Sequence, residues 1–398
     1  MPPCPRASAG RPRRRARGRR RPTAGPAAPP AAPPAGMVPP AGSEQPWPGR
    51  ARSLHHGPLR VFAGNAHPQL AQDIAAQMGV PLSKADVGRF KCGEVSVVIN
   101  ESVRDCDVFV IQPTCNGGAG PQEHIVELLI MLDAIRRGSP NRLTAVMPLF
   151  GYARQNAKDR SRSPITARLM TDLLQVAGAQ SVLTVELHAP QIQGFASYPI
   201  DNTFALSLIA QEIQSVLTDR GWSAEDVMVV SPDVGGTKRA SSLAKIFNAP
   251  LAIFSRQRRR ASGGSEVDLV GDPAGKVCIV IDDIADTGET LVHAAAKLKA
   301  RGAEAVLCAC IHGIFSDPAV DLFNNSEMEL VIVTDTIPMA DKAARCPKIR
   351  VVSVAPLLAA AILRLHTGRG PNNKAGLLPA PSGGGWRARS EAMESAGT

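Results

Sequence analysis

Short apolar runs alternate with longer amphipathic segments from residue 58 to residue 368. The short runs are rich in Val and Ile without alternating polar residues, which indicates strands buried on both faces. The longer segments repeat their apolar residues with the period of a helix. We expect strands at Leu59–Ala63, Val108–Gln112, Leu143–Pro148, Val182–Leu187, Val227–Val230, Leu251–Phe254, Val277–Ile281, Ala305–Ile311, Leu330–Thr334 and Ile349–Val354. We expect helices at Gln69–Met78, Glu123–Arg137, Thr166–Ala177, Leu206–Leu217, Thr237–Phe247, Thr290–Ala300 and Pro356–His366.

This alternation predicts an α/β protein with doubly wound parallel sheets. About ten strands exceed one sheet of ordinary width, so we expect two domains. We place them at residues 58–202 and 203–368, between an extension at 1–57 and a loose tail at 369–398. In such folds ligands bind beyond the carboxyl ends of the strands, which is where we look for functional residues.

Residues 1–57 differ in composition from the rest of the chain. They contain 11 Arg, no Lys, one acid (Glu44) and 14 of the 34 prolines, so the whole net charge of +10 lies here. Such a segment cannot bury enough apolar surface to fold, and we predict disorder. It is typical of a plastid or mitochondrial transit peptide, but an untargeted extension or initiation at Met37 explains it equally well. We expect a cytoplasmic protein unless this segment directs it to an organelle.

The rest of the chain has as many acidic as basic residues, and aromatic residues make up only 4% of the sequence. This composition argues against a basic, aromatic nucleic-acid groove. No uncharged apolar run approaches the ~18 residues of a membrane span, so we expect no membrane partner. The eight cysteines form no CxxC pair, which favours free thiols over a disulfide framework or zinc site.

The sharpest motif is an acidic turn that follows the expected strand Val277–Ile281. The amino end of the next helix suits a phosphate, while carboxylates accept hydrogen bonds from ribose hydroxyls or hold Mg²⁺ through water. One ligand, ribose 5-phosphate, would place its phosphate at the helix start and its hydroxyls at the carboxylates. The alternative is an ordinary helix cap, which needs only one Asp or Thr. The residues that we assign to this ligand are Asp282, Asp283, Asp286, Thr287, Gly288 and Thr290.

Two further groups of polar residues follow expected strands. Four cations, beginning at Arg154, come after Leu143–Pro148 and suit a polyphosphate, although a solvated charged loop is as plausible. His188 and Asp233 follow two other strands, where a metal or phosphate role competes with an ordinary structural one.

Taken together, these segments resemble the ribose-phosphate pyrophosphokinase (phosphoribosyl pyrophosphate synthetase) family over about residues 59–368. Further matching segments are Glu101–Arg104, Glu127–Met131, His312–Ser316 and Thr336–Pro338. The resemblance implies two phosphoribosyltransferase-like domains related by a pseudo-twofold, assembled into dimers and hexamers. It implies transfer of the diphosphoryl group of ATP to C1 of ribose 5-phosphate, with Mg²⁺, giving phosphoribosyl pyrophosphate and AMP.

The resemblance also implies roles for individual residues. Those implied to bind ATP are Phe90 and Glu94, across a subunit boundary, with Arg154, Gln155, Asp159 and His188. Metal ligands are expected among His188, Asp233, Glu186 and Asp201, and catalytic groups at Arg256, Arg258 and His188.

This chain departs from the family at several positions. Arg256 stands where the family has a catalytic Lys, and Cys92, Glu186 and Glu289 are further variants. Arg keeps the charge but not the shape of Lys. A second hypothesis is therefore a weakly active or non-catalytic subunit that associates with related synthetase subunits. A third, weaker hypothesis is a single-domain phosphoribosyltransferase that uses a nucleobase as its substrate. It would leave the first half of the chain unexplained.

Overall fold

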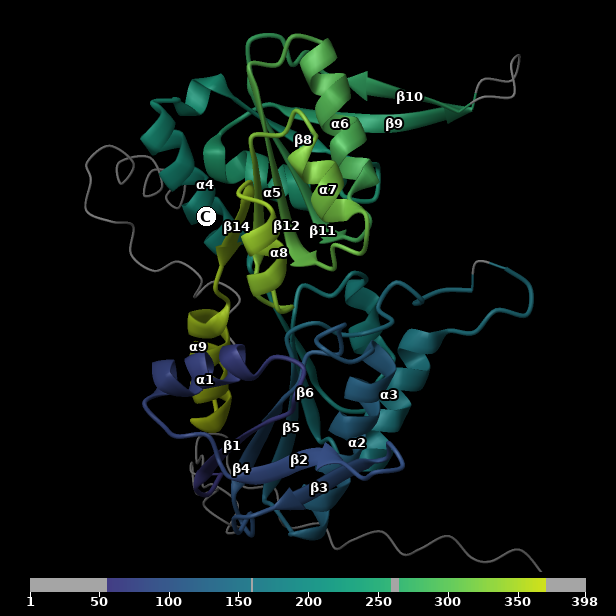
Figure 1. Ribbon diagram of the computed structural model, residues 1–398, viewed down its shortest axis with the longest axis vertical. Helices are drawn as coiled ribbons and strands as arrows, with labels where there is room; N and C mark the ends of the chain where they lie inside the picture. The colour runs from purple at the N-terminus through teal and green to yellow at the C-terminus, as the bar shows by residue number, and fades with distance from the viewer. Residues whose placement is uncertain (1–55, 159, 259–264, 370–398) are drawn as a thin grey trace, which may run out of the picture. The chain divides into compact units, whose positions relative to one another are not determined.

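The computed structural model describes residues 56–369, except residue 159 and residues 259–264 (Figure 1). The described residues fall in one compact unit. The predicted disordered extension and the tail lie almost wholly outside the described residues. The boundary that we placed at residue 203 stays a prediction.

The first sheet is parallel, with strand order β1-β4-β5-β6-β7. Its strands are β1 (Leu59–Ala63), β4 (Asp107–Ile111), β5 (Arg142–Met147), β6 (Ser181–Val185) and β7 (Ile200–Thr203). Successive side chains of a strand point to opposite faces. Val61 therefore packs with α1 (Pro68–Met78) and α9 (Ala355–His366), and Phe62 with α2 (Pro121–Arg137) and α3 (Thr166–Ala177).

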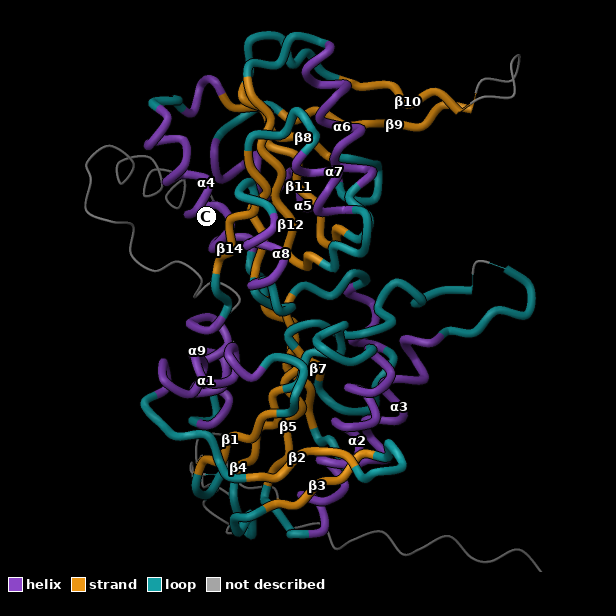
Figure 2. The backbone as a smooth tube through the Cα atoms, in the orientation of Figure 1, coloured by secondary structure: helices purple, strands orange, loops and turns teal. Residues whose placement is uncertain are grey.

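The second sheet has the order β10-β9-β8-β11-β12-β13-β14. Its strands are β8 (Val227–Ser231), β9 (Leu251–Arg258), β10 (Ser265–Val270), β11 (Val277–Ala285), β12 (Ala305–Gly313), β13 (Leu330–Thr334) and β14 (Ile349–Val352). All neighbours are parallel except β9 and β10, an antiparallel pair that extends from the edge of the sheet (Figure 2).

Helices cover both faces of the second sheet. Buried residues of α4 (Leu206–Arg220) and α5 (Thr237–Phe247) pack on one face with Ile279, and those of α6 (Glu289–Ala300) and α7 (Ala319–Asn324) on the other with Val280. The remaining short elements are α8 (Ala340–Arg345) and the 3₁₀ helices Pro190–Gly194 and Ala224–Asp226. The expected doubly wound α/β architecture is confirmed.

All ten expected strands and seven expected helices form, with ends shifted by a few residues. The patterns missed β7, β10 and the antiparallel pair of β2 (Ala85–Arg89) and β3 (Val95–Ile99). β2 carries Asp86 and Gly88, and β7 reads Ile-Asp-Asn-Thr, so neither has the continuous apolar run that we used to recognise strands. No helix in the described part of the chain is long and apolar enough to cross a membrane.

Candidate active site

A cavity of about 530 Å³ lies where four segments at or after strand ends meet. It brings together nine of the residues singled out from the sequence: Arg154, His188, Asp233, Asp282, Asp283, Asp286, Thr287, Gly288 and Thr290. They follow β5, β6, β8 and β11, whose carboxyl ends lie toward the site as parallel sheets require. The structure therefore brings these nine residues to one cavity, while their roles in binding stay a prediction.

The acidic segment is partly strand and partly turn. β11 continues past Ile281 to Ala285, because Asp282 pairs with Cys310 and Ile284 with His312 of β12. Gly288 then takes φ 76°, and α6 begins at Glu289 without a side-chain cap. A Cβ on Gly288 would lie 2.4 Å from the ring of Phe323. The first N–H groups of α6 therefore remain available to an anion.

The two adjacent carboxylates differ in environment. Asp283 is 8% exposed, and its Oδ2 lies 2.6 Å from Nδ1 of His188, while its Oδ1 accepts from Nη1 of Arg239 at 3.4 Å. Burial alone would raise the pKa of Asp283, but the hydrogen bond from His188 and the charge of Arg239 hold it below its ordinary value. The pKa of Asp282 is raised by burial and by the neighbouring Asp283.

Hydrogen bonding also shifts the pKa of the imidazole of His188. The bond to Asp283 raises the pKa of His188, against the opposing effect of burial. The carboxylate accepts from Nδ1, so the other ring nitrogen, Nε2, remains for a ligand. A half-buried His and two carboxylates of different pKa can hold a sugar and a phosphate side by side.

Arg154 and Gln155 follow β5 but take different positions. Nη1 of Arg154 lies 3.1 Å from Oδ2 of Asp286, so it lines the cavity beside the acidic turn. Oε1 of Gln155 accepts from the hydroxyl of Thr166 at 2.5 Å, at the start of α3, and Gln155 does not line the cavity. The structure therefore does not bring Gln155 to the site with Arg154.

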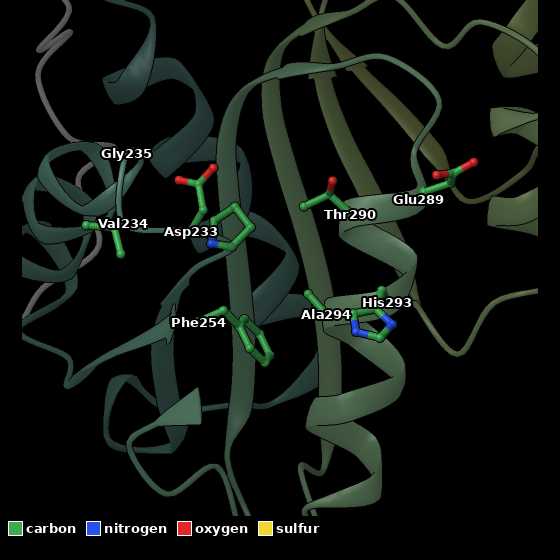
Figure 3. Close-up of a pocket in the computed structure, with 9 residues that line it drawn as sticks. Asp233, Val234, Gly235, Phe254, Glu289, Thr290, His293 and Ala294 are labelled. Atoms are coloured by element: carbon green, nitrogen blue, oxygen red, sulfur yellow. The ribbon is translucent and has the colours of Figure 1, made fainter. Parts of the chain in front are cut away.

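A second cavity, of about 750 Å³, shares Asp233, Gly235 and Thr290 with the first. Figure 3 shows Asp233 and Phe254 on one side and Thr290, Ala294 and His293 of α6 on the other, with the Glu289 carboxylate directed away. Oδ1 of Asp233 accepts the N–H of Gly236 at 2.8 Å, which fixes this wall.

Sequence reasoning missed several of these lining residues. Arg239 stands three residues after a Gly pair at the start of a helix, which is the one signal that could have found it. Phe254 and His293 carry no such signal, because each reads as an ordinary residue of a strand or an amphipathic helix.

The four expected metal ligands do not form one cluster. Among the described residues, no group of three or more His, Cys, Asp or Glu side chains is arranged to hold an ion. Glu186 is 6% exposed with φ 44°, outside both cavity linings, and burial raises its pKa to about 7. Asp201 lies within β7, where it pairs with Leu183 of β6, and burial raises its pKa against the opposing charge of Arg142 at the start of β5. Asp201 therefore lies away from the site. The structure therefore does not bring Glu186 and Asp201 to the cavity with His188, and their role as metal ligands stays a prediction.

Three other groups of expected residues lie elsewhere. Phe90 and Glu94 lie in the exposed turn between β2 and β3 and line neither cavity, so their contact with a nucleotide across a subunit boundary stays a prediction. Asp159 lies outside the described residues. Arg256 and Arg258 belong to β9, and of these two residues only the backbone is described.

The fold and the site define a class: an α/β protein whose parallel strands deliver paired carboxylates and an uncapped helix start to one cavity, which suits a phosphorylated sugar. Residues 59–178 match the N-terminal domain of ribose phosphate pyrophosphokinase, and residues 264–372 match the phosphoribosyl synthetase-associated domain. The chain belongs to the ribose-phosphate pyrophosphokinase family.

Individual relatives support that membership. Ribose-phosphate pyrophosphokinase A of Dictyostelium discoideum is 46% identical over 310 residues, which cover 78% of this chain and 95% of that protein. The ribose-phosphate pyrophosphokinase of Xanthomonas campestris pv. campestris is 48% identical over 312 residues, with 78% and 95% covered. The crystal structure of phosphoribosylpyrophosphate synthetase from Mycobacterium smegmatis matches with a TM-score of 0.72 and 40% identity, over 78% of this chain and 99% of that one.

Proposed function

We propose that this chain is a ribose-phosphate diphosphokinase, a transferase that moves the β,γ-diphosphoryl group of ATP to the C1 hydroxyl of ribose 5-phosphate. The products are phosphoribosyl pyrophosphate, a precursor for nucleotide synthesis, and AMP. The observation that carries the proposal is that one cavity is lined by Asp282, the uncapped start of α6, Arg154 and His188.

The acidic turn and α6 would bind the sugar phosphate. The phosphate group would accept hydrogen bonds from the first N–H groups of α6 and from the hydroxyls of Thr287 and Thr290, where the helix dipole favours negative charge. Asp282 would accept hydrogen bonds from the ribose hydroxyls. A carboxylate near the phosphate would repel it, so the two ends of the ligand must lie at different residues.

Arg154 and His188, which follow β5 and β6 of the first sheet, would bind the polyphosphate of ATP beside the acidic turn. Phosphoryl transfer depends mainly on positioning and on neutralising charge, so a cation and an imidazole at the phosphates are the groups that the reaction needs. Arg256 and Arg258 lie in the last part of β9, and we propose that these two residues complete the cationic set.

The same cavity fits Mg²⁺. This ion keeps several waters and needs only one or two protein carboxylates beside the phosphates of its substrate, so a cluster of three protein ligands is not required. Asp233 lines the cavity with one oxygen free of the Gly236 N–H, and Nε2 of His188 is free of Asp283. Bound there with ATP, Mg²⁺ would supply charge neutralisation at the phosphates.

We also propose that the chain self-associates into dimers and hexamers, and that these assemblies can include related synthetase subunits. Phe90 is 58% exposed in the turn after β2, which is unusual for a large aromatic side chain and is consistent with burial against another subunit. Light scattering after size-exclusion chromatography tests this: a mass of a single chain at micromolar concentration would contradict it.

The test of the activity is AMP formation by the purified chain from ATP, ribose 5-phosphate and Mg²⁺. We expect AMP to appear only when ribose 5-phosphate is present, and Asp282→Asn to raise the KM for that sugar about tenfold or more. No turnover by the chain alone, with stimulation of an added synthetase, would establish the non-catalytic subunit instead. Formation of AMP that does not depend on ribose 5-phosphate would exclude both the diphosphokinase and the non-catalytic subunit.

We propose cytoplasmic activity, with delivery to a plastid or mitochondrion by the first 57 residues as the alternative. The first strand, β1, begins at Leu59, and the family match also begins at residue 59. Removal of residues 1–57 should therefore leave kcat and KM unchanged. Fusion of residues 1–57 to a fluorescent protein tests targeting, and a diffuse cytosolic signal would end the targeting hypothesis.

A further inference from the structure

A buried histidine of the second sheet, His312, contacts the turn of the first sheet that carries His188. Nε2 of His312 lies 3.1 Å from the carbonyl oxygen of Val185, which ends β6, and 3.1 Å from that of Glu186, which follows it. His312 belongs to β12 and is 1% exposed. His188 comes two residues after Glu186 and lines the cavity. The contact therefore joins the second sheet to the segment that brings His188 to the site.

The partners of His312 determine which ring nitrogen carries the proton. Carbonyl oxygens can only accept hydrogen bonds, so Nε2 is the donor. Burial lowers the pKa of His312 to about 4, so at neutral pH the ring is uncharged and carries one proton. Nδ1, which lies 2.8 Å from the hydroxyl of Thr336, therefore accepts from that hydroxyl. The ring is held at both nitrogens, and its one N–H points at the turn.

The turn after β6 depends on distant residues for its backbone hydrogen bonds. The N–H of Glu186 donates to the carbonyl of Thr203 at 2.9 Å, and the N–H of Leu187 donates to Oδ1 of Asn202 at 3.0 Å. His312 supplies the donor on the carbonyl side of the turn. Glu186 has φ 44°, a left-handed conformation that a residue other than glycine keeps only where its surroundings hold it. Loss of the His312 N–H would leave buried carbonyl oxygens unsatisfied and release this side of the turn.

The strand that carries His312 is irregular at this point. Its pairing with β13 shifts register between Cys310 and His312. Such an irregularity redirects the side chains of a strand and is common beside active sites. His312 pairs with Ile284 of β11 and Thr334 of β13, so it lies at the carboxyl ends of three neighbouring strands. This is the edge of the second sheet from which a side chain can reach the site.

We infer that His312 is a positioning residue: its donation to the carbonyl oxygens of Val185 and Glu186 holds the turn in the conformation that directs the His188 imidazole into the cavity. The inference rests on the proposed function, in which His188 binds the polyphosphate of ATP. His312 lines neither cavity, so its effect on the reaction passes through the turn.

Two amide substitutions separate the roles of the two ring nitrogens. The amide nitrogen of His312→Gln reaches the place of Nε2, whereas that of His312→Asn reaches only the place of Nδ1 and cannot donate to the turn. In steady-state kinetics of the full-length chain, His312→Asn should raise the KM for ATP about tenfold or more and the KM for ribose 5-phosphate less than about threefold. His312→Gln should restore most of the lost affinity for ATP.

The same kinetics separate positioning from a general structural role. A loss of folded protein lowers kcat through the active fraction and leaves KM unchanged. Cys308→Ala is the matched control, because Cys308 is also buried on β12 and its Sγ packs 3.0 Å from Sδ of Met328. It should lower the melting temperature without a change in the KM for ATP. Equal rises of this KM in Cys308→Ala and His312→Asn would overturn the inference, as would equal rises of both KM values in His312→Asn.

A double-mutant cycle tests whether the effect passes through His188. In a His188→Gln background, His312→Asn should raise the KM for ATP less than about twofold further, because the group that it positions is already lost. Effects that multiply in full would overturn the inference. If His312→Asn does not fold, Thr336→Val takes its place, since loss of the hydroxyl lets the proton move to Nδ1 and Nε2 then cannot donate. An unchanged KM for ATP in that variant would likewise overturn the inference.

Calorimetry of ATP binding with Mg²⁺, in the absence of the sugar, distinguishes failure of this inference from failure of the proposed function. A wild-type chain that forms no AMP contradicts the proposed function, while the ATP affinities of His312→Asn and His312→Gln still decide whether His312 positions the turn. A wild-type chain that binds no ATP overturns both. An active wild-type chain whose His312→Asn variant binds ATP equally tightly overturns the inference alone.

Discussion

Nη1 of Arg154 lies 3.1 Å from Oδ2 of Asp286, which joins the segment after β5 to the turn after β11. The two side chains are 58% and 38% exposed, so their ion pair adds little to folding stability. Each is instead placed to meet a ligand: the guanidinium suits a phosphate of ATP, and the carboxylate belongs to the turn that would bind the sugar phosphate. Binding of either substrate should therefore change the surroundings of the other.

We predict that Arg154→Ala raises the KM for ATP about tenfold or more and leaves the melting temperature almost unchanged. The reason is that the variant loses a phosphate contact and only an exposed ion pair. Steady-state kinetics and thermal unfolding of the same preparation measure both. Arg168→Ala is the matched control, since Arg168 forms a similarly exposed pair with Asp172 at 3.0 Å on α3, outside the cavities. Equal effects of the two variants on ATP would contradict the assignment.

We predict that Gly288→Ala weakens ribose 5-phosphate binding and destabilises the protein by about 1–4 kcal/mol. Two causes act together: the backbone has φ 76°, which L side chains rarely adopt, and the added Cβ would meet the ring of Phe323 at 2.4 Å. Urea unfolding and calorimetry of sugar binding measure the two effects. Gly194→Ala is the control, because a Cβ there meets nothing within 4 Å. A Gly288→Ala protein with unchanged sugar affinity would mean that this turn does not hold the ligand.

The burial of His312 predicts that the free energy of unfolding depends on pH. It is fully buried on β12, where Nδ1 lies 2.8 Å from the Thr336 hydroxyl and Nε2 lies 3.1 Å from the carbonyl oxygens of Val185 and Glu186. Burial lowers its pKa to about 4, from an ordinary value of 6.5. Between these values the unfolded state binds more protons than the folded state, so the free energy of unfolding rises with pH.

The contribution of His312 is therefore complete above about pH 6.5 and is lost as the pH falls toward about 4, on the order of 3 kcal/mol in all. Urea unfolding of wild type and His312→Gln at several pH values measures it, since the variant keeps a donor and an acceptor but does not titrate. The stability difference between the two proteins should shrink as the pH falls through this window. A difference that is constant with pH would show that His312 does not titrate there.

Much of the fold could be predicted from the sequence because its parallel strands are buried on both faces. The runs at Val277–Ile281 and Ala305–Ile311 consist almost wholly of apolar residues, and such runs leave few alternatives. Polar strands were missed: β7 is recognised only through its pairing with β6, which is a long-range contact that no local pattern encodes. The end of β11 was missed for the same reason, since Asp282 is a strand residue only through its pairing with Cys310.

The candidate site was predictable where a motif follows a strand, and not where tertiary packing decides. The acidic turn and His188 were identified because carboxyl ends of parallel strands meet at one edge. Residue type alone could not separate Asp282 from Asp283, because the difference lies in Arg239 and His188, which are distant in sequence. Asp201 has the right residue type for a metal ligand, but its place in mid-strand puts it away from the site.

Transfer of the intact diphosphoryl group is the central claim, and ATP carrying a radioactive label at the β or at the γ phosphorus tests it most directly. After a turnover with ribose 5-phosphate and Mg²⁺, we predict that both labels appear in the sugar product in equal yield, with unlabelled AMP as the other product. Transfer of the γ label alone with formation of ADP, or release of both labels as free pyrophosphate, would contradict the account.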